Sequence, residues 1–220
     1  MKHEEIRLNH YRYAPWQEDL EFAKLYQNIK ASTLVDVYRS YELWSLVEQT
    51  AKLKEGAFIE IGVWRGGTGA LIAKKAKLCG LNDTVYLCDT FTGVVKATSK
   101  DDHYKGGEHA DVNYDDVINM FKGLGLDNVK FLKGIYPDDT KSLMTDNKIR
   151  FCHIDVDTYQ STKDIVDSIW DMIVPNGIIV FDDYGFHGCG GATVYGNEIQ
   201  NDKDKIFLYN LNGHSIVIKR

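Results

Sequence analysis

The sequence contains no long hydrophobic run. None of its apolar stretches reaches the roughly 18 residues that span a lipid bilayer. The polar, aromatic-rich N-terminus has no apolar segment typical of a signal peptide. We therefore expect no membrane partner and a cytoplasmic location.

Cysteine is also scarce. The four cysteines, Cys79, Cys88, Cys152 and Cys189, are far apart and form no C-x-x-C pair. This spacing argues against a disulfide framework and against a zinc site. It favours buried free thiols in a reducing compartment.

An excess of positive charge is absent as well. Lys and Arg total 26 against 32 Asp and Glu, which gives a formal net charge of −6. A chain with this balance is a poor partner for nucleic acid or an anionic membrane, so we expect neither as the main ligand. The 220 residues, 44% of them hydrophobic, suit one soluble domain with a sizeable core.

Strand-like and helical segments alternate along the chain. Apolar strand-like runs occur at 57–62, 84–89, 128–134, 149–157 and 178–183, and residues 33–54 have the apolar spacing of an amphipathic helix. Alternation predicts an α/β fold, a mostly parallel Rossmann-like sheet with helices on both faces. Pro175-Asn176-Gly177 predicts a turn, and Asn212-Gly213 predicts a C-terminal antiparallel hairpin. We interpret 33–220 as the domain and 1–32 as an N-terminal accessory or lid segment.

A glycine-rich turn follows the first predicted strand in "EIGVWRGG". Gly62 and Gly66 let the backbone approach a ligand, but the spacing fits neither a dinucleotide-binding turn nor a P-loop. Asp89 closes the next strand, where an acid usually binds ribose hydroxyls, and Glu60 suits the cationic end of an amino-acid-like ligand. Together they predict a site for S-adenosyl-L-methionine. The alternative is a tight strand–helix turn with Asp89 as a helix cap.

Four carboxylates follow two other predicted strands, in "HIDVDTYQST" and "GIIVFDDYG". Asp155 and Asp157 share one side of a strand end, and Asp182 and Asp183 end a second strand. Buried like charges are costly unless neutralised, and oxygen ligands favour Mg²⁺, Mn²⁺ or Ca²⁺. Three acids would hold the cation and leave positions for an alcohol or diol, and the fourth would take a proton. The alternative is helix capping or exposed loop carboxylates.

These motifs resemble the macrocin O-methyltransferase family. "EIGVWRGGT" is similar to its first cofactor motif, "CDTFTG" to its "ADSFEG", "FLKGIYPDDT" to its "FLKGWFxDT", "HIDVDTYQST" to its "LDGDxYEST" and "VFDDYG" to its "VDDYG". The resemblance covers about residues 33–200. It implies a class I, metal-dependent enzyme that uses S-adenosyl-L-methionine to methylate a sugar hydroxyl of a small molecule.

The resemblance also assigns roles to residues. The metal ligands would be Asp155, Asp182 and Asp183, and Asp157 would be the general base. The cofactor contacts would include Glu60, Gly62 and Asp89. Because "GIYPDDT" is one residue longer than the family pattern, both Asp138 and Asp139 stand as adenine contacts. The segment 92–111 lacks the family's proline-rich stretch, so the acceptor stays open.

Two other functions are left as alternatives. One is a metal-dependent glycosyltransferase that uses the Asp155/Asp157 pair, although the glycine turn does not suit a diphosphate. The other is a non-catalytic cofactor-binding subunit. The aromatic N-terminus, with Tyr11, Tyr13 and Trp16, would fold over the site or form a contact in a homo-oligomer.

Overall fold

The computed structural model describes residues 13–81, 83–211 and 213–220, and its core is one seven-stranded sheet in the order β3-β2-β1-β4-β5-β7-β6. The strands are β1 (Ala57–Ile61), β2 (Val85–Asp89), β3 (Val129–Lys133), β4 (Ile149–Ile154), β5 (Ile173–Phe181), β6 (Lys205–Tyr209) and β7 (Ser215–Lys219). Strands β1 to β5 pair in parallel, and β7 is antiparallel to both β5 and β6. The mostly parallel sheet and the C-terminal hairpin are confirmed, although Asn212 itself lies outside the described residues.

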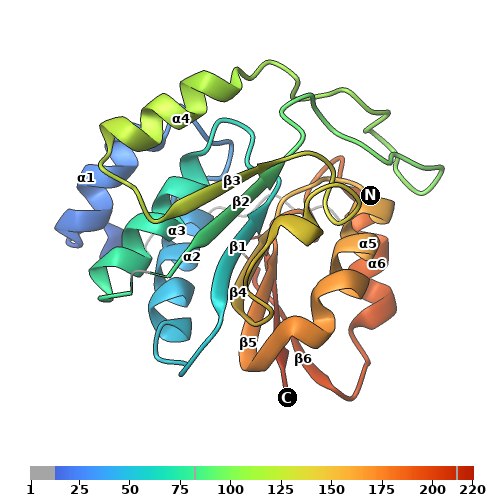
Figure 1. The fold of residues 1–220 in the computed structure, drawn as a ribbon. Helices are drawn as coiled ribbons and strands as arrows, with labels where there is room; N and C mark the ends of the chain where they lie inside the picture. The colour runs from blue at the N-terminus through green and yellow to red at the C-terminus, as the bar shows by residue number, and fades with distance from the viewer. Residues whose placement is uncertain (1–12, 82, 212) are drawn as a thin grey trace.

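Helices cover both faces of this sheet (Figure 1). They are α1 (Leu20–Ile29), α2 (Val37–Thr50), α3 (Gly67–Leu78), α4 (Tyr114–Gly123), α5 (Tyr159–Ile169) and α6 (Gly190–Ile199), with 3₁₀ turns at Pro15–Gln17, Lys141–Leu143 and Trp170–Met172. One hydrophobic core lies between the sheet and α1–α4, and a second lies under α5 and α6. Burial of apolar area in these two layers is the main stabilising term.

The N-terminal region contributes to the first core. Phe22, Leu25 and Ile29 of α1 are buried and pack in the same cluster as α2 and α3. Helix α2 begins at Val37 because Asp36 caps it, accepting hydrogen bonds from the backbone N–H groups of the next turn. Residues 32–35 lie between α1 and α2 and form neither helix nor strand. Tyr11, which we expected to lie over the site or in a contact of a homo-oligomer, is outside the described residues.

One local expectation has a different outcome. The predicted turn at 175–177 lies inside β5, where Asn176 adopts a φ of +64° and the pairing of β4 with β5 shifts register. The turn residues are thus accommodated as a bulge within a longer strand.

All four cysteines are free thiols, and three of them are buried. Among the described residues, no helix combines the length and apolar character needed to cross a membrane.

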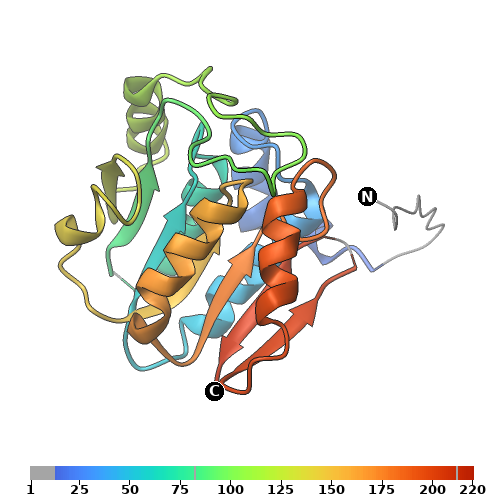
Figure 2. The same cartoon turned by 90° about the vertical axis from the view of Figure 1, so that its right-hand side faces the viewer.

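The strand order reverses between β1 and β4, so the loops after these neighbouring strands diverge. In open α/β sheets this point opens a crevice at the carboxyl edge, where ligands bind. The long segment between β2 and α4 arches over that edge, drawn in green at the top of Figure 2. The fold therefore gathers the ends of β1, β2, β4 and β5 under one cover.

Candidate functional site

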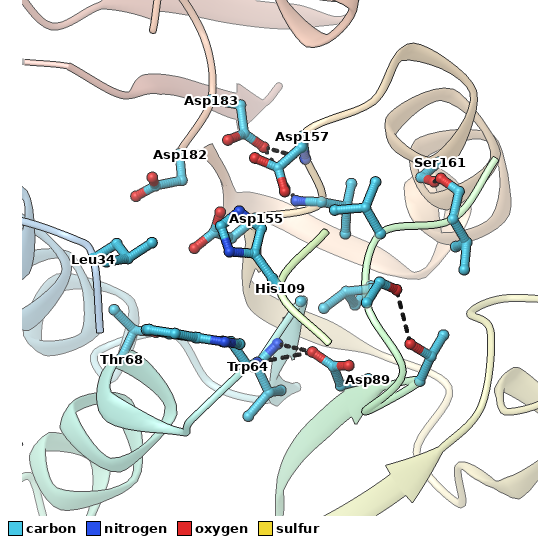
Figure 3. A pocket seen from close by; sticks show the side chains of 18 of the residues that line it. Leu34, Trp64, Thr68, Asp89, His109, Asp155, Asp157, Ser161, Asp182 and Asp183 are labelled. Atoms are coloured by element: carbon cyan, nitrogen blue, oxygen red, sulfur yellow. Dashed lines mark hydrogen bonds between the residues drawn. The ribbon is translucent and has the colours of Figure 1, made fainter. Parts of the chain in front are cut away.

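A pocket of about 190 Å³ lies at the carboxyl edge of the sheet. Six of the residues predicted from the sequence line it: Gly62, Asp89, Asp155, Asp157, Asp182 and Asp183. Figure 3 shows the four acids after β4 and β5 together on one side of the pocket, and Asp89 beside Trp64 on the other. Four predicted residues do not line it: Glu60, Gly66, Asp138 and Asp139.

The two glycines of the first turn have different tasks. Gly62 has a φ of +90°, and a Cβ there would lie 1.7 Å from the backbone oxygen of Asp155. Only glycine allows the ends of β1 and β4 to approach this closely. Gly66, also at positive φ, caps α3 and faces α4, where a Cβ would lie 2.8 Å from Phe121. Gly66 thus serves helix packing and does not reach the pocket.

Asp89 fastens the turn after β1 to the end of β2. Its carboxylate accepts hydrogen bonds from the backbone N–H groups of Val63 (2.6 Å), Trp64 (2.8 Å) and Phe91 (2.6 Å). A carboxylate has about four acceptor positions, so about one stays open toward the pocket. The predicted alternative, that Asp89 caps a helix, does not describe this geometry, because the α3 cap is Gly66.

Glu60 lies beneath the pocket wall. Its side chain is fully buried, and Oε1 lies 2.9 Å from Nδ1 of His153 on the neighbouring strand. The other oxygen, Oε2, has no hydrogen-bond partner among the described residues. Burial raises the pKa of Glu60. The structure therefore does not bring Glu60 to the position from which it would contact a cofactor directly.

Asp138 and Asp139 are both exposed and are not among the residues that line the pocket. Asp138 pairs with Lys96 at 2.7 Å, and Asp139 Oδ2 accepts the backbone N–H of Ile135 at 2.9 Å. The wall of the pocket at this point consists of Gly134, Ile135 and Tyr136. A ligand here would meet backbone and apolar groups first, and an adenine contact by either aspartate stays a prediction.

Three aspartates meet as the sequence predicted. One carboxylate oxygen each from Asp155, Asp182 and Asp183 lies within 4.8 Å of the others. The Asp155 carboxylate accepts no hydrogen bond from any residue that the structure describes. Burial, together with the charges of Asp182 and Asp183, raises the pKa of Asp155 well above its usual range. An all-oxygen cluster with an unmatched carboxylate fits a hard divalent cation.

Asp182 differs from its two neighbours because it is already paired. Its Oδ1 lies 2.8 Å from Nε2 of His214 and 3.5 Å from Nε2 of His153, and its Oδ2 pairs with Arg39. Burial favours the neutral carboxyl, but the interactions with His153 and His214 and the Arg39 charge outweigh it and hold the pKa of Asp182 well below its usual range. Asp182 is therefore ionised, with its charge largely matched.

Asp157 sits beside the cluster in a strained conformation. Its φ is +65°, a region that costs energy for any residue other than glycine. The backbone N–H groups of Val156 (3.1 Å) and Asp157 (2.8 Å) both donate to Asp183 Oδ2, which fixes the turn. Burial and the charge of Asp183 raise the pKa of Asp157. A carboxylate with a raised pKa at a pocket suits a general base.

The segment between β2 and α4 covers the pocket without forming a helix or strand in residues 90–113. Buried Asp101 holds it in place, accepting the N–H groups of Thr98 (2.6 Å) and Tyr159 (2.8 Å). Backbone hydrogen bonds join Val94 to Glu108 (2.8 Å) across the base of the segment. These contacts attach the segment to the start of α5 and close its base.

Several pocket residues escaped the sequence analysis. The covering segment places Tyr104 and His109 on the wall, with Tyr104 Oη 3.3 Å from His109 Nε2. Trp64 also lines the pocket and packs edge-on against His109. The signal for this aromatic wall was the histidine- and tyrosine-containing segment 92–111. Arg39 and His214 gave none, because each meets Asp182 only through the tertiary fold.

The comparisons with known proteins agree with this geometry. The family model described as Macrocin-O-methyltransferase (TylF) matches residues 17–206. Mycinamicin III 3''-O-methyltransferase of Micromonospora griseorubida is 29% identical over 179 residues, which cover 74% of this chain and 69% of that protein. The 8-demethyl-8-(2,3-dimethoxy-alpha-L-rhamnosyl)-tetracenomycin-C 4'-O-methyltransferase of Streptomyces olivaceus is 32% identical over 176 residues, 74% of this chain and 66% of that protein.

The chain thus spans about two thirds of the length of these two relatives. Among solved structures, the O-methyltransferase NovP superposes with a TM-score of 0.74 at 22% identity, covering 86% of this chain and 82% of that chain. At this identity the superposition shows a common fold.

Proposed function

Because the chain belongs to the macrocin O-methyltransferase family and has the class I methyltransferase fold, we propose that it methylates a hydroxyl of a sugar or sugar-containing metabolite. The methyl donor is S-adenosyl-L-methionine, and the reaction depends on a divalent cation, Mg²⁺ or a similar ion. The observation that carries this proposal is the meeting of Asp155, Asp182 and Asp183 within 4.8 Å at the wall of the pocket.

The cofactor occupies the half of the pocket between the ends of β1 and β2. Gly62 gives close backbone access there, and the remaining acceptor position of Asp89 suits a ribose hydroxyl. Ile135 and Tyr136 supply an apolar wall on the side of β3. Glu60 lies beneath the wall, paired with His153, and is not among the residues that line the pocket.

Asp155, Asp182 and Asp183 would hold the cation, since one carboxylate oxygen of each lies within 4.8 Å of the others. The fit rests on the donor chemistry: the oxygens are hard, and the Asp155 carboxylate has no donor of its own among the described residues. When bound, a divalent cation holds the acceptor hydroxyl and lowers its pKa. Relief of the repulsion among the acids favours its binding.

Asp157 is the base of the proposed reaction. It accepts the proton of the acceptor hydroxyl while the oxygen attacks the methyl group in line, so the O–H and S–C bonds break and the O–C bond forms. The raised pKa of Asp157 suits this task. Asp183 fixes the position of Asp157 through two backbone hydrogen bonds, so positioning is part of the catalysis.

The acceptor class rests on one relative and on the chemistry of the site. The tetracenomycin relative is named as the 4'-O-methyltransferase of a rhamnosyl compound. A sugar offers neighbouring hydroxyls that fit the open positions of an acid-held cation. Trp64, Tyr104 and His109 provide the aromatic and polar wall that a sugar ring needs.

Calorimetry with S-adenosylhomocysteine, with and without Mg²⁺, tests the proposal first. We expect the homocysteine product to bind without metal, and Mg²⁺ to bind with measurable affinity in its presence. Turnover of a rhamnosylated acceptor should stop in EDTA and return with Mg²⁺ or Mn²⁺. Absence of S-adenosylhomocysteine binding by the wild type would refute the methyltransferase proposal, and full turnover in EDTA would remove the cation from it. A nucleotide sugar serves as the control ligand, since its preferential binding would favour a glycosyltransferase.

A further inference from the structure

A buried array of ionisable side chains lies behind the acid cluster. It runs from Glu42 on α2 through His214 to Asp182, and from Asp182 through His153 to Glu60 on β1. Asp182 is the one member of this array that lines the pocket. The other members connect that carboxylate to α2 and to the β6–β7 connection.

His214 uses both ring nitrogens in this array. Its Nε2 lies 2.8 Å from Asp182 Oδ1, and its Nδ1 lies 2.8 Å from Glu42 Oε2. The ring is completely buried. Glu42 Oε1 also accepts the side-chain amide of Asn210, so α2 holds the β6–β7 connection at two points. A ring held between two carboxylates has little freedom to rotate.

Arg39 holds the other oxygen of the same carboxylate. The guanidinium is 3% exposed, pairs with Asp182 Oδ2, and is itself held by Asp36 at 2.9 Å. Asp182 is therefore gripped at Oδ1 by His214 and at Oδ2 by Arg39. His153 is a weaker contact, since its Nε2 is 3.5 Å away and makes no hydrogen bond to a described residue.

We propose that His214, oriented by Glu42, is a positioning residue that fixes the Asp182 carboxylate toward Asp155 and Asp183, so that the C-terminal hairpin takes part in cation binding. This inference rests on the proposed metal-dependent function. Arg39 already neutralises the charge of Asp182. Asp182 therefore contributes to cation binding chiefly through the position of its oxygen atoms. Without His214, the Asp182 carboxylate is held mainly at Oδ2 by Arg39 and can rotate, so its oxygen no longer has a fixed position relative to Asp155 and Asp183. Outer groups that orient a ligand typically change metal affinity by about 10–100-fold.

Mn²⁺ binding to the full chain, followed by calorimetry and by electron paramagnetic resonance, tests this directly. The variants are His214→Ala, His214→Gln and Glu42→Gln. The matched control is Glu48→Gln, the same change on the same helix at an exposed residue that pairs with Lys75. Affinity for S-adenosylhomocysteine and the thermal unfolding midpoint are measured for each variant.

We expect His214→Ala to weaken Mn²⁺ affinity by about 10-fold or more and to leave S-adenosylhomocysteine affinity within about twofold. His214→Gln, whose amide can still donate to Asp182, should recover part of the loss. Glu42→Gln should weaken Mn²⁺ affinity by about threefold, and Glu48→Gln should leave Mn²⁺ affinity unchanged. In turnover, the Mn²⁺ concentration for half-activity should rise more than kcat at saturating Mn²⁺ falls.

Wild-type Mn²⁺ affinity in a folded His214→Ala would overturn the inference and leave the proposed function standing. Should His214→Ala fail to fold, Glu42→Gln decides, and Mn²⁺ affinity equal to that of Glu48→Gln would overturn the inference. A wild type that binds S-adenosylhomocysteine but no Mn²⁺ would overturn both this inference and the cation requirement.

Discussion

Replacement of Asp183 by asparagine measures how much charge repulsion in the acid cluster destabilises the fold, separately from the role of the cluster in cation binding. Asp183 is buried, and burial, followed by the charge of Asp182, raises its pKa from 3.8 to about 6. Asparagine carries no charge, and its side-chain oxygen can still accept the backbone N–H groups of Val156 and Asp157. The substitution thus removes the repulsion while it keeps the turn.

The sign and the size of the expected stability change follow from the linkage between proton binding and folding. A carboxyl group whose pKa is higher in the folded state binds more protons when folded, so stability falls as the pH rises from about 4 to about 6. The rise of about two pKa units corresponds to about 3 kcal/mol of unfolding free energy, lost in full above pH 6. In EDTA at pH 7.5, we therefore expect Asp183→Asn to be more stable than the wild type by up to about 3 kcal/mol. Below pH 4 this gain should vanish.

Urea denaturation in EDTA at pH 4 and pH 7.5 measures the effect, and Asp182→Asn is the matched control. Asp182 pairs with Arg39 and His214, so its replacement leaves these two buried side chains without their carboxylate partner. We expect this change to lower the unfolding free energy by about 3–5 kcal/mol at pH 7.5. Saturating Mg²⁺ should stabilise the wild type and not Asp183→Asn. If Asp183→Asn is less stable than the wild type in EDTA at pH 7.5, or if its effect does not depend on pH, the electrostatic account of the cluster is wrong.

Three further substitutions test individual roles. Asp157→Asn should lower kcat by about 10²–10⁴-fold, the usual contribution of a positioned base. The affinities for S-adenosylhomocysteine and Mg²⁺ should stay near the wild-type values, and added metal should not restore kcat. A loss of metal affinity would contradict the assignment of Asp157 as the base. Asp89→Ala should weaken S-adenosylhomocysteine by about 1–3 kcal/mol in calorimetry, because the turn after β1 loses its acceptor; unchanged affinity would argue against a cofactor at that end. Gly62→Ala should lower the unfolding free energy in urea by more than about 2 kcal/mol, because its Cβ would collide with the backbone of Asp155; a wild-type value would mean that the strand ends separate easily.

The sequence was sufficient for the parts of the fold that depend on short-range pattern. Alternating apolar runs identified the five parallel strands, and the parallel order required their carboxyl ends to share one edge. The four acids after β4 and β5 could be grouped on that basis, because β4 and β5 are neighbours with a register that aligns Ile154 with Phe181. The choice of Asp155, Asp182 and Asp183 among them came from the family resemblance. The grouping therefore needed topology and no side-chain detail.

The remaining site residues depend on contacts that no local pattern reports. Glu60 was expected on the pocket wall, but it stands opposite His153 in the register of β1 and β4 and turns toward that ring. Asp138 and Asp139 follow β3 in a loop whose direction the sequence does not fix. Arg39 lies 143 positions from Asp182 in the chain, so their contact is visible only in the fold.

The covering segment separates its anchors from its working side chains. Asp101 and the Val94–Glu108 backbone pair hold the segment, whereas Tyr104 and His109 line the pocket. A rigid frame with exchangeable contact residues is the arrangement that loop grafting exploits in antibodies and designed binders. Libraries confined to positions 104 and 109 should accordingly change which acceptor the enzyme prefers without unfolding the domain, which makes this segment the natural starting point for altering its selectivity.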